Sequence, residues 1–173
     1  MQFRAPESDA VCLTFDDGYR NFYEEALPIL RRYHVKATMF VVTAYVDTDR
    51  PMPFDRWGLR HQAETPSNAW LPLGWRDIEA CIDSGLVEFG SHSHRHANGA
   101  VCSADEVREE AQRSREVLRR RLGDDHAACY AYPYGSTRLR NVTPDYIDAV
   151  RDSGYSLAVS TNMGRASSRC DAY

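Results

Sequence analysis

The sequence has no long hydrophobic segment and no excess of basic residues. No apolar run approaches the roughly 18 residues of a membrane-spanning helix, and the N-terminal stretch MQFRAPESDAVCLTF lacks the charged, apolar and small-residue regions of a secretory signal. The formal net charge at pH 7 is −4, whereas nucleic-acid-binding domains usually carry a clustered basic excess. We therefore expect no membrane span and no nucleic-acid partner, and a cytoplasmic location by default.

Cysteine is present, but its pattern indicates neither a complete disulfide framework nor a zinc knuckle. The count of five is odd, and no two cysteines have the C-x-x-C spacing. We expect most of them to be small buried residues; they are Cys12, Cys81, Cys102, Cys129 and Cys170.

Apolar segments alternate with helical patterns along the 173 residues, a usual length for one domain. We expect a single domain over residues 1–173, with strands at 10–15, 37–42, 86–89, 127–132 and 155–160 and helices at 21–33, 74–85, 103–122 and 144–152. Continuous apolar strands separated by helices favour an α/β fold with a parallel sheet covered on both faces. The segment at about 47–73 interrupts the alternation, and an insertion of that length is usually functional or mobile.

Unusual residues follow three of the expected strands. They form TFDDG after the first strand, GSHSHRH after the third and YPYGS after the fourth. In parallel α/β sheets and barrels, functional side chains gather at the carboxyl ends of the strands. This coincidence is the main argument from the residues alone for an active site.

The pair Asp16 and Asp17 lies at the end of the first strand, just before Gly18. Consecutive side chains leave an extended chain in opposite directions, so the two carboxylates are expected to have different roles. A competing interpretation is an Asx-turn or helix cap before the helix that begins near Asn21.

Three of the six histidines lie within residues 92–96. His92 could bind a metal with His94 if the chain stays extended, or with His96 if it turns after Gly90. We favour His92 and His96, because the strand looks too short to continue through residue 96, and His94 would then point away. The competing interpretation is a solvated histidine-rich loop. Two histidines and a carboxylate leave coordination positions open, which suits a catalytic ion.

Taken together, TFDDG (14–18), HSHRH (92–96) and YPYG (132–135) resemble, in order and spacing, the motifs of the polysaccharide deacetylases, the NodB-homology domains of carbohydrate esterase family four. The resemblance covers about residues 10–165. It implies a distorted (β/α)7 barrel, and it leaves open whether the chain is truncated at its C-terminal end. The implied activity is the metal-dependent removal of N-acetyl groups, occasionally O-acetyl groups, from amino-sugar polymers.

The resemblance also implies roles for individual residues. Asp16 would be the general base, and Asp17, His92 and His96 would hold a divalent metal, usually Zn²⁺, with Co²⁺ or Ni²⁺ as alternatives. The backbone N–H of Tyr134 would stabilise the oxyanion. Two further residues, Pro133 and Gly135, would shape that substrate-binding loop.

Two features depart from the family's pattern. The usual R-x-P-Y-G motif has Ala131 at the arginine position, which brings the chain closer to a subgroup with an A-Y-P-Y/F-G form that includes enzymes acting on poly-N-acetylglucosamine. The family's late general-acid histidine has no counterpart, because no histidine follows His126. His94 and His61 are the remaining candidates for that role.

The substrate expected from the resemblance is an N-acetylated glycan. Trp57 and Trp70, both in the insertion, are candidates for stacking on its sugar rings. Two alternatives remain at this stage: a non-catalytic carbohydrate-binding or scaffold domain that keeps the fold, and a deacetylase or deformylase of a lipid- or nucleotide-linked sugar. The sequence does not indicate the oligomeric state.

Overall fold

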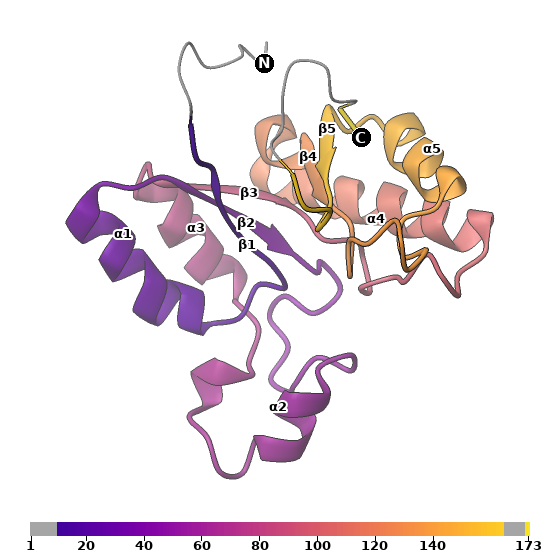
Figure 1. The fold of residues 1–173 in the computed structure, drawn as a ribbon. Coiled ribbons are helices and arrows are strands. Elements are labelled where there is room, and N and C mark those ends of the chain that lie inside the picture. Colours follow the sequence, from indigo (N-terminus) through magenta and orange to yellow (C-terminus); the bar gives the residue numbers. More distant parts are fainter. Residues whose placement is uncertain (1–9, 165–171) are drawn as a thin grey trace.

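Five parallel strands form one sheet in a computed structural model that describes residues 10–164 and 172–173 (Figure 1). Their order across the sheet is their order along the chain, and every neighbouring pair is parallel. The strands are β1 (Leu13–Phe15), β2 (Ala37–Val41), β3 (Val87–Ser91), β4 (Cys129–Ala131) and β5 (Leu157–Val159). All five strands were predicted. β2 begins at the predicted residue, whereas the other four strands begin one to three residues after the start of their apolar runs.

The helices connect successive strands. They are the π-helical segment η1 (Phe22–Ala26) with α1 (Leu27–Tyr33), then α3 (Trp75–Asp83), α4 (Ala104–Leu122) with the 3-10 segment η3 (Asp124–Ala127), and α5 (Pro144–Asp152). The insertion holds α2 (Arg56–His61) and the 3-10 segment η2 (Ser67–Ala69), and it projects away from the layer of strands and helices (Figure 1). No helix in the described residues is long and apolar enough to cross a membrane.

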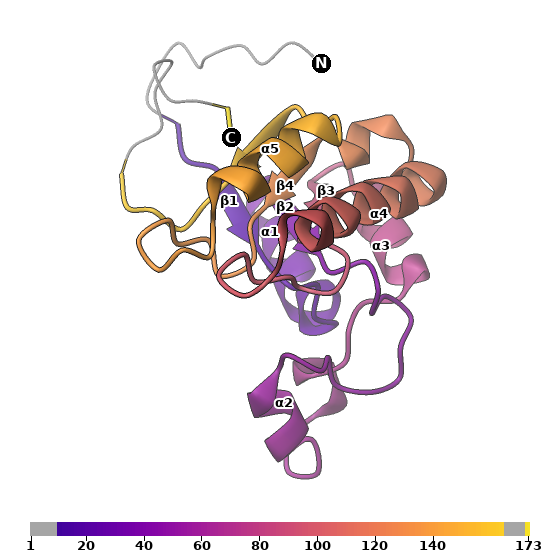
Figure 2. The ribbon, with the colours of Figure 1, turned by 90° about the vertical axis from the view of Figure 1, so that its right-hand side faces the viewer.

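The side chains on one face of the sheet pack against the helices. Met39 and Phe89 pair across β2 and β3 and lie in a cluster with residues of α1 and α3. Tyr130 pairs with Ala158 and packs against α4 and α5, which lie against each other (Figure 2). Right-handed connections between strands in chain order place all the helices on the same side of a sheet.

The opposite face is the inner side of a curled half-barrel. Thr14 and Glu88 on that face are exposed, while Phe40 is buried with its ring against Gly90, where a Cβ would come within 2.7 Å of it. The expectation of a sheet covered on both faces is therefore wrong. The error has a physical cause: strands of a barrel have apolar residues on both faces, as buried strands of a two-faced sheet do.

Capping residues determine where α4 and α5 begin. The Ser103 hydroxyl accepts a hydrogen bond from the Glu106 N–H, and the Glu106 carboxylate accepts one from the Ser103 N–H at 2.7 Å, which is the predicted capping box. Thr143 caps α5 in the same way through the Tyr146 N–H, with Pro144 in the first turn.

The cysteines of the described residues are all free. Only Cys81 is fully buried, while Cys102 and Cys129 are partly exposed and Cys12 is exposed. The expectation that most are buried is therefore wrong for these four. Cys170 lies outside the described residues.

Candidate functional site

The turn after β1 separates the two adjacent aspartates. Asp17 and Gly18 both have left-handed backbone conformations, with φ of 72° and 85°, and the Gly18 N–H donates to the Asp16 carbonyl at 2.9 Å. A Cβ on Gly18 would lie 2.9 Å from Val41 Cγ1, so only glycine fits without displacement. This turn leaves Asp16 exposed and directs the Asp17 carboxylate inward, as different roles for the two residues require.

The Asp17 carboxylate faces two imidazoles from the loop after β3. Asp17 Oδ1 lies 3.5 Å from His92 Nε2 and 3.3 Å from His96 Nε2, and the three atoms lie within 4.8 Å of one another. Left-handed conformations at Ser93 (φ 63°) and His96 (φ 66°) turn the loop so that both rings face the same point. His94 points elsewhere, since its Nδ1 lies 3.0 Å from Thr43 Oγ1.

Hydrogen bonding orients the first of these imidazoles. His92 is 3% exposed, and its Nδ1 lies 2.9 Å from the carbonyl oxygen of Ala131. That contact places the proton on Nδ1 and leaves the Nε2 lone pair directed at Asp17. Burial lowers the pKa of His92 below its usual value, which favours the neutral imidazole that binds metals.

The three side chains fit a divalent cation. The Asp17 Oδ1 atom is buried and has no hydrogen-bond partner among the described residues, and a buried carboxylate oxygen without a partner is costly. Two imidazole nitrogens and one carboxylate oxygen are ligands that Zn²⁺ and similar ions take in catalytic sites. A cation bound between the three side chains would therefore interact with Asp17 Oδ1, which has no hydrogen-bond partner among the described residues.

Aromatic rings enclose His96, and one of them was not predicted. Phe54, from the insertion, stacks on the His96 ring with centroids 3.9 Å apart and an interplanar angle of 13°, while Tyr134 contacts the same ring edge-on at 4.7 Å. The insertion thus reaches the site through Phe54. Only the position of Phe54 in a proline-rich insertion could have suggested this contact.

A pocket of about 370 Å³ brings most of the predicted residues together. Its wall includes Asp16, Asp17, His92, His96 and Tyr134. The insertion contributes Phe54, Asp55 and Arg56, and the rest of the lining is Tyr19, Tyr132 and Thr161. Acidic, imidazole and aromatic groups in one cleft are typical of a catalytic pocket.

The loop that carries Tyr134 turns tightly beneath this pocket. Tyr134 and Gly135 have φ of 61° and 60°, and a Cβ on Gly135 would lie 2.7 Å from the backbone nitrogen of Thr161. Pro133 is buried under the loop. Neither Pro133 nor Gly135 lines the pocket, so their contribution is to the shape of the loop.

The two predicted tryptophans do not line the pocket. Trp57 is 50% exposed on α2, where its ring lies 5.3 Å from that of His61, and Trp70 is partly buried. The candidate general acids are also outside it. His61 lies beside Glu64 on the insertion, and His94 bonds to Thr43.

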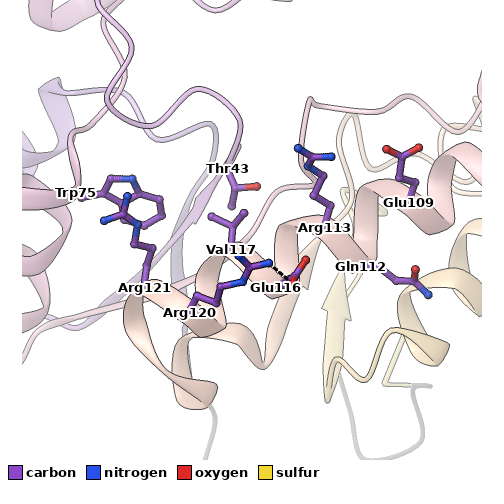
Figure 3. Close-up of a pocket in the computed structure, with 9 residues that line it drawn as sticks. All are labelled: Thr43, Trp75, Glu109, Gln112, Arg113, Glu116, Val117, Arg120 and Arg121. Atoms are coloured by element: carbon purple, nitrogen blue, oxygen red, sulfur yellow. Dashed lines mark hydrogen bonds and ion pairs between the residues drawn. The ribbon is translucent and has the colours of Figure 1, made fainter.

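A larger open pocket, of about 660 Å³, lies along the outer side of α4 (Figure 3). Its charged side chains mostly pair with their neighbours: Arg120 bonds to Glu116, and the Arg121 guanidinium lies 5.1 Å from the centre of the Trp75 ring. Among the described residues, the only cluster suited to a metal is that of Asp17, His92 and His96. The chemistry therefore favours the smaller pocket as the functional site.

Comparison with known proteins agrees with the fold and the motifs. A family model described as polysaccharide deacetylase matches residues 4–158. The chain is 33% identical over 95 residues to poly-beta-1,6-N-acetyl-D-glucosamine N-deacetylase of Escherichia coli, covering 55% of this chain and 13% of that protein. It is 24% identical over 153 residues to the protein of the same name from Staphylococcus epidermidis, covering 84% of this chain and 45% of that protein.

The structure also resembles solved deacetylases. Superposition on the Streptococcus pyogenes deacetylase PplD, solved in complex with acetate, gives a TM-score of 0.70 at 25% identity, over 93% of this chain and 60% of that one. This likeness confirms the predicted α/β barrel-type fold. The chain spans less than half the length of the two curated relatives. Because the family model covers most of the sequence, the chain belongs to the polysaccharide deacetylase family.

Proposed function

We propose that the protein is a divalent-metal-dependent N-deacetylase that acts on a polymer of N-acetylglucosamine. The observation that carries the proposal is the convergence of Asp17 Oδ1, His92 Nε2 and His96 Nε2 beside a second, exposed carboxylate, Asp16, in one pocket. Asp17, His92 and His96 would hold the ion, with Zn²⁺ as the expected metal and Co²⁺ or Ni²⁺ as alternatives. When bound, such an ion lowers the pKa of water to about 7 and polarises an amide carbonyl.

Residues of the chain would carry out the proton transfers and stabilise the oxyanion. The Asp16 carboxylate would accept a proton from the attacking water as the water oxygen bonds to the acetyl carbon. The Tyr134 N–H, which none of the hydrogen bonds among the described residues uses, would donate to the oxyanion that develops on the acetyl oxygen. Since no histidine beyond the two proposed ligands lines the described pocket, the protonated Asp16 would return its proton to the amine nitrogen. The bond between that nitrogen and the acetyl carbon would break in the same step, which gives acetate and the free amine.

The choice of glycan rests on two observations. The motif A-Y-P-Y-G places Ala131 where the related R-x-P-Y-G motif has arginine, and the Ala131 carbonyl is already used to orient His92. Two relatives carry the name poly-beta-1,6-N-acetyl-D-glucosamine N-deacetylase. We therefore propose β-1,6-linked N-acetylglucosamine as the first substrate to test, ahead of chitin-like and peptidoglycan-like polymers.

The test is acetate release from β-1,6-linked N-acetylglucosamine oligomers. The protein is first stripped of metal with a chelator and then supplied with Zn²⁺, Co²⁺ or Ni²⁺. We expect release by the parent to depend on the added metal, and to be lost in Asp16→Asn and His92→Ala but retained in His61→Ala, whose imidazole lies outside the pocket. Equal release by the parent and by both site variants would exclude the proposed site. Parallel assays on β-1,4-linked oligomers, peptidoglycan and nucleotide-linked sugars identify the substrate.

A second candidate function is glycan binding without catalysis. It is favoured by the absence of a cation at the Ala131 position and of a histidine able to act as a general acid among the described pocket residues. Under this alternative, the parent would bind Zn²⁺ and the oligomer, as measured by calorimetry, but would release no acetate with any of the three metals.

A further inference from the structure

A buried carboxylate lies behind the histidine loop, outside the pocket. Glu110 is 4% exposed and is one of the buried residues of α4, a helix that contacts β3 and α5 (Figure 2). The other buried residues of α4 are mostly apolar and include Val107 and Ala111. Glutamate is rarely buried so deeply unless its charge is paired, so the position needs a specific reason.

Both oxygens of Glu110 bind one residue of the loop. The Arg95 backbone N–H donates to Oε2 at 2.5 Å, and the Arg95 side-chain Nε–H donates to Oε1 at 2.7 Å. Hydrogen bonds to a charged acceptor are short and about twice as strong as neutral ones. Arg95 immediately precedes His96, so this contact fixes the backbone next to a proposed metal ligand.

The loop needs such support because its conformation is unfavourable. Ser93 and His96 are both left-handed, which residues other than glycine adopt only when the surroundings hold them there. The loop is tied across its length by the Ala97 N–H to Ser93 Oγ, and to the segment after β2 by the N–H groups of Thr43 and Ala44, which donate to the carbonyls of Ser93 and His94. Glu110 adds two hydrogen bonds to Arg95, the residue directly before His96.

The His96 ring depends on its backbone more than the His92 ring does. The His92 Nδ1 atom is bonded to the Ala131 carbonyl, but the His96 Nδ1 atom is buried without a hydrogen-bond partner among the described residues. The direction of His96 Nε2 toward Asp17 is therefore set by the loop backbone and by ring contacts.

From these contacts we infer that Glu110 is a positioning residue of the metal centre. Its carboxylate holds the Arg95 peptide so that His96 Nε2 stays 3.3 Å from Asp17 Oδ1. The inference rests on the proposed function, since it assumes that His96 binds a metal.

The experiment measures metal affinity in the full chain. Dissociation constants for Zn²⁺ are obtained by competition with a chromophoric chelator, and the visible absorption bands of bound Co²⁺ report the ligand geometry. Glu110→Ala should weaken Zn²⁺ binding about 10- to 100-fold, the range typical of residues that orient metal ligands. Glu110→Gln keeps one oxygen that can accept the Arg95 N–H but loses the charge and the second acceptor, so its Zn²⁺ affinity should lie between those of the parent and Glu110→Ala.

The matched control is Glu109→Gln, one residue away on α4. Glu109 is exposed and approaches the same Arg95 at 4.0 Å, so its substitution should leave the affinity and the Co²⁺ spectrum unchanged. Circular dichroism and thermal unfolding without metal identify a variant that does not fold. If Glu110→Ala does not fold, Glu110→Gln is compared with Glu109→Gln instead. Only Glu110→Gln is expected to bind Zn²⁺ more weakly than the parent.

The possible results distinguish a failure of this inference from a failure of the proposed function. If the parent binds Zn²⁺ and the folded Glu110 variants bind it equally tightly, the positioning role is refuted while the proposed function stands. If the parent takes up no metal, the proposed function fails and the inference fails with it. A loss of thermal stability in Glu110→Ala with unchanged Zn²⁺ affinity shows a purely structural residue and also refutes the inference.

Discussion

The turn that directs Asp17 toward the histidines depends on Gly18, and Gly18→Ala measures how strongly. Gly18 has a φ of 85°, and a left-handed conformation costs an L-residue about 1–2 kcal/mol. The new Cβ would also lie 2.9 Å from Val41 Cγ1, closer than the roughly 3.5–4.0 Å of a favourable carbon–carbon contact. Val41 is fully buried and has little room to move, so overpacking should add about 1–3 kcal/mol.

We therefore expect Gly18→Ala to lower the free energy of unfolding by about 2–5 kcal/mol in total. The matched control is Gly85→Ala. Gly85 is also left-handed, with a φ of 71°, but a Cβ there would meet no atom within 4 Å. Only the backbone cost of about 1–2 kcal/mol applies to that variant.

The assay is urea unfolding of the metal-free proteins, followed by Zn²⁺ titration of those that fold. Gly18→Ala should lose more stability than Gly85→Ala, and its Zn²⁺ affinity should fall about 10-fold or more because the turn that places Asp17 is displaced. Gly85→Ala should bind Zn²⁺ as the parent does. Equal losses of stability in the two variants would refute the steric argument.

Three further results are expected. Phe54→Ala should weaken Zn²⁺ binding about 2- to 10-fold because the ring that stacks on His96 is lost, whereas Phe54→Tyr should bind as the parent does. If Phe54→Ala and the parent bind Zn²⁺ equally tightly, the ring contact does not orient His96. Zn²⁺ at 100 times its dissociation constant should stabilise the parent by about 2.7 kcal/mol, and a stabilisation that persists in His92→Ala would mean that the ion binds elsewhere. Burial raises the pKa of the Cys81 thiol to about 12. A thiol reagent at pH 8 should therefore label exposed Cys12 and leave Cys81 unlabelled until the chain unfolds, as peptide mass analysis can show. Labelling of Cys81 in the folded protein would contradict its burial.

Local patterns predicted the elements of this fold better than their arrangement. The capping box at Ser103 and the Thr143–Pro144 pair depend on residues at most three positions apart, so the local sequence contains all the information about them. The arrangement of the sheet was not predictable from the same runs. In β2, Met39 faces the helices and Phe40 lies against Gly90 on the other side, and such a continuous apolar run is equally consistent with a barrel and with a sheet covered by helices on both faces.

The candidate site was predictable where its residues come from strand ends. Asp16, Asp17 and the histidines follow β1 and β3, which both pair with β2, and parallel strands of one sheet have their carboxyl ends at the same edge. The shortness of β3 favoured His92 with His96 over His92 with His94, and the structure places the first pair beside Asp17. The contact of Phe54 with His96 joins residues 42 positions apart through an irregular segment, and no periodicity or motif reports such a contact.

Glu110 is a different case, because the sequence carries a signal that could have been used. The helix from Ser103 to Leu122 has one face marked by Val107, Ala111 and Leu118, and Glu110 falls on that face. A charged residue at a core position of an amphipathic helix conflicts with the hydrophobic pattern. Such conflicts are expected where a protein gives up core stability to hold a functional group in place. The position of the conflict can be found from periodicity alone, but its partner, the Arg95 peptide, is known only once the loop after β3 is placed against α4.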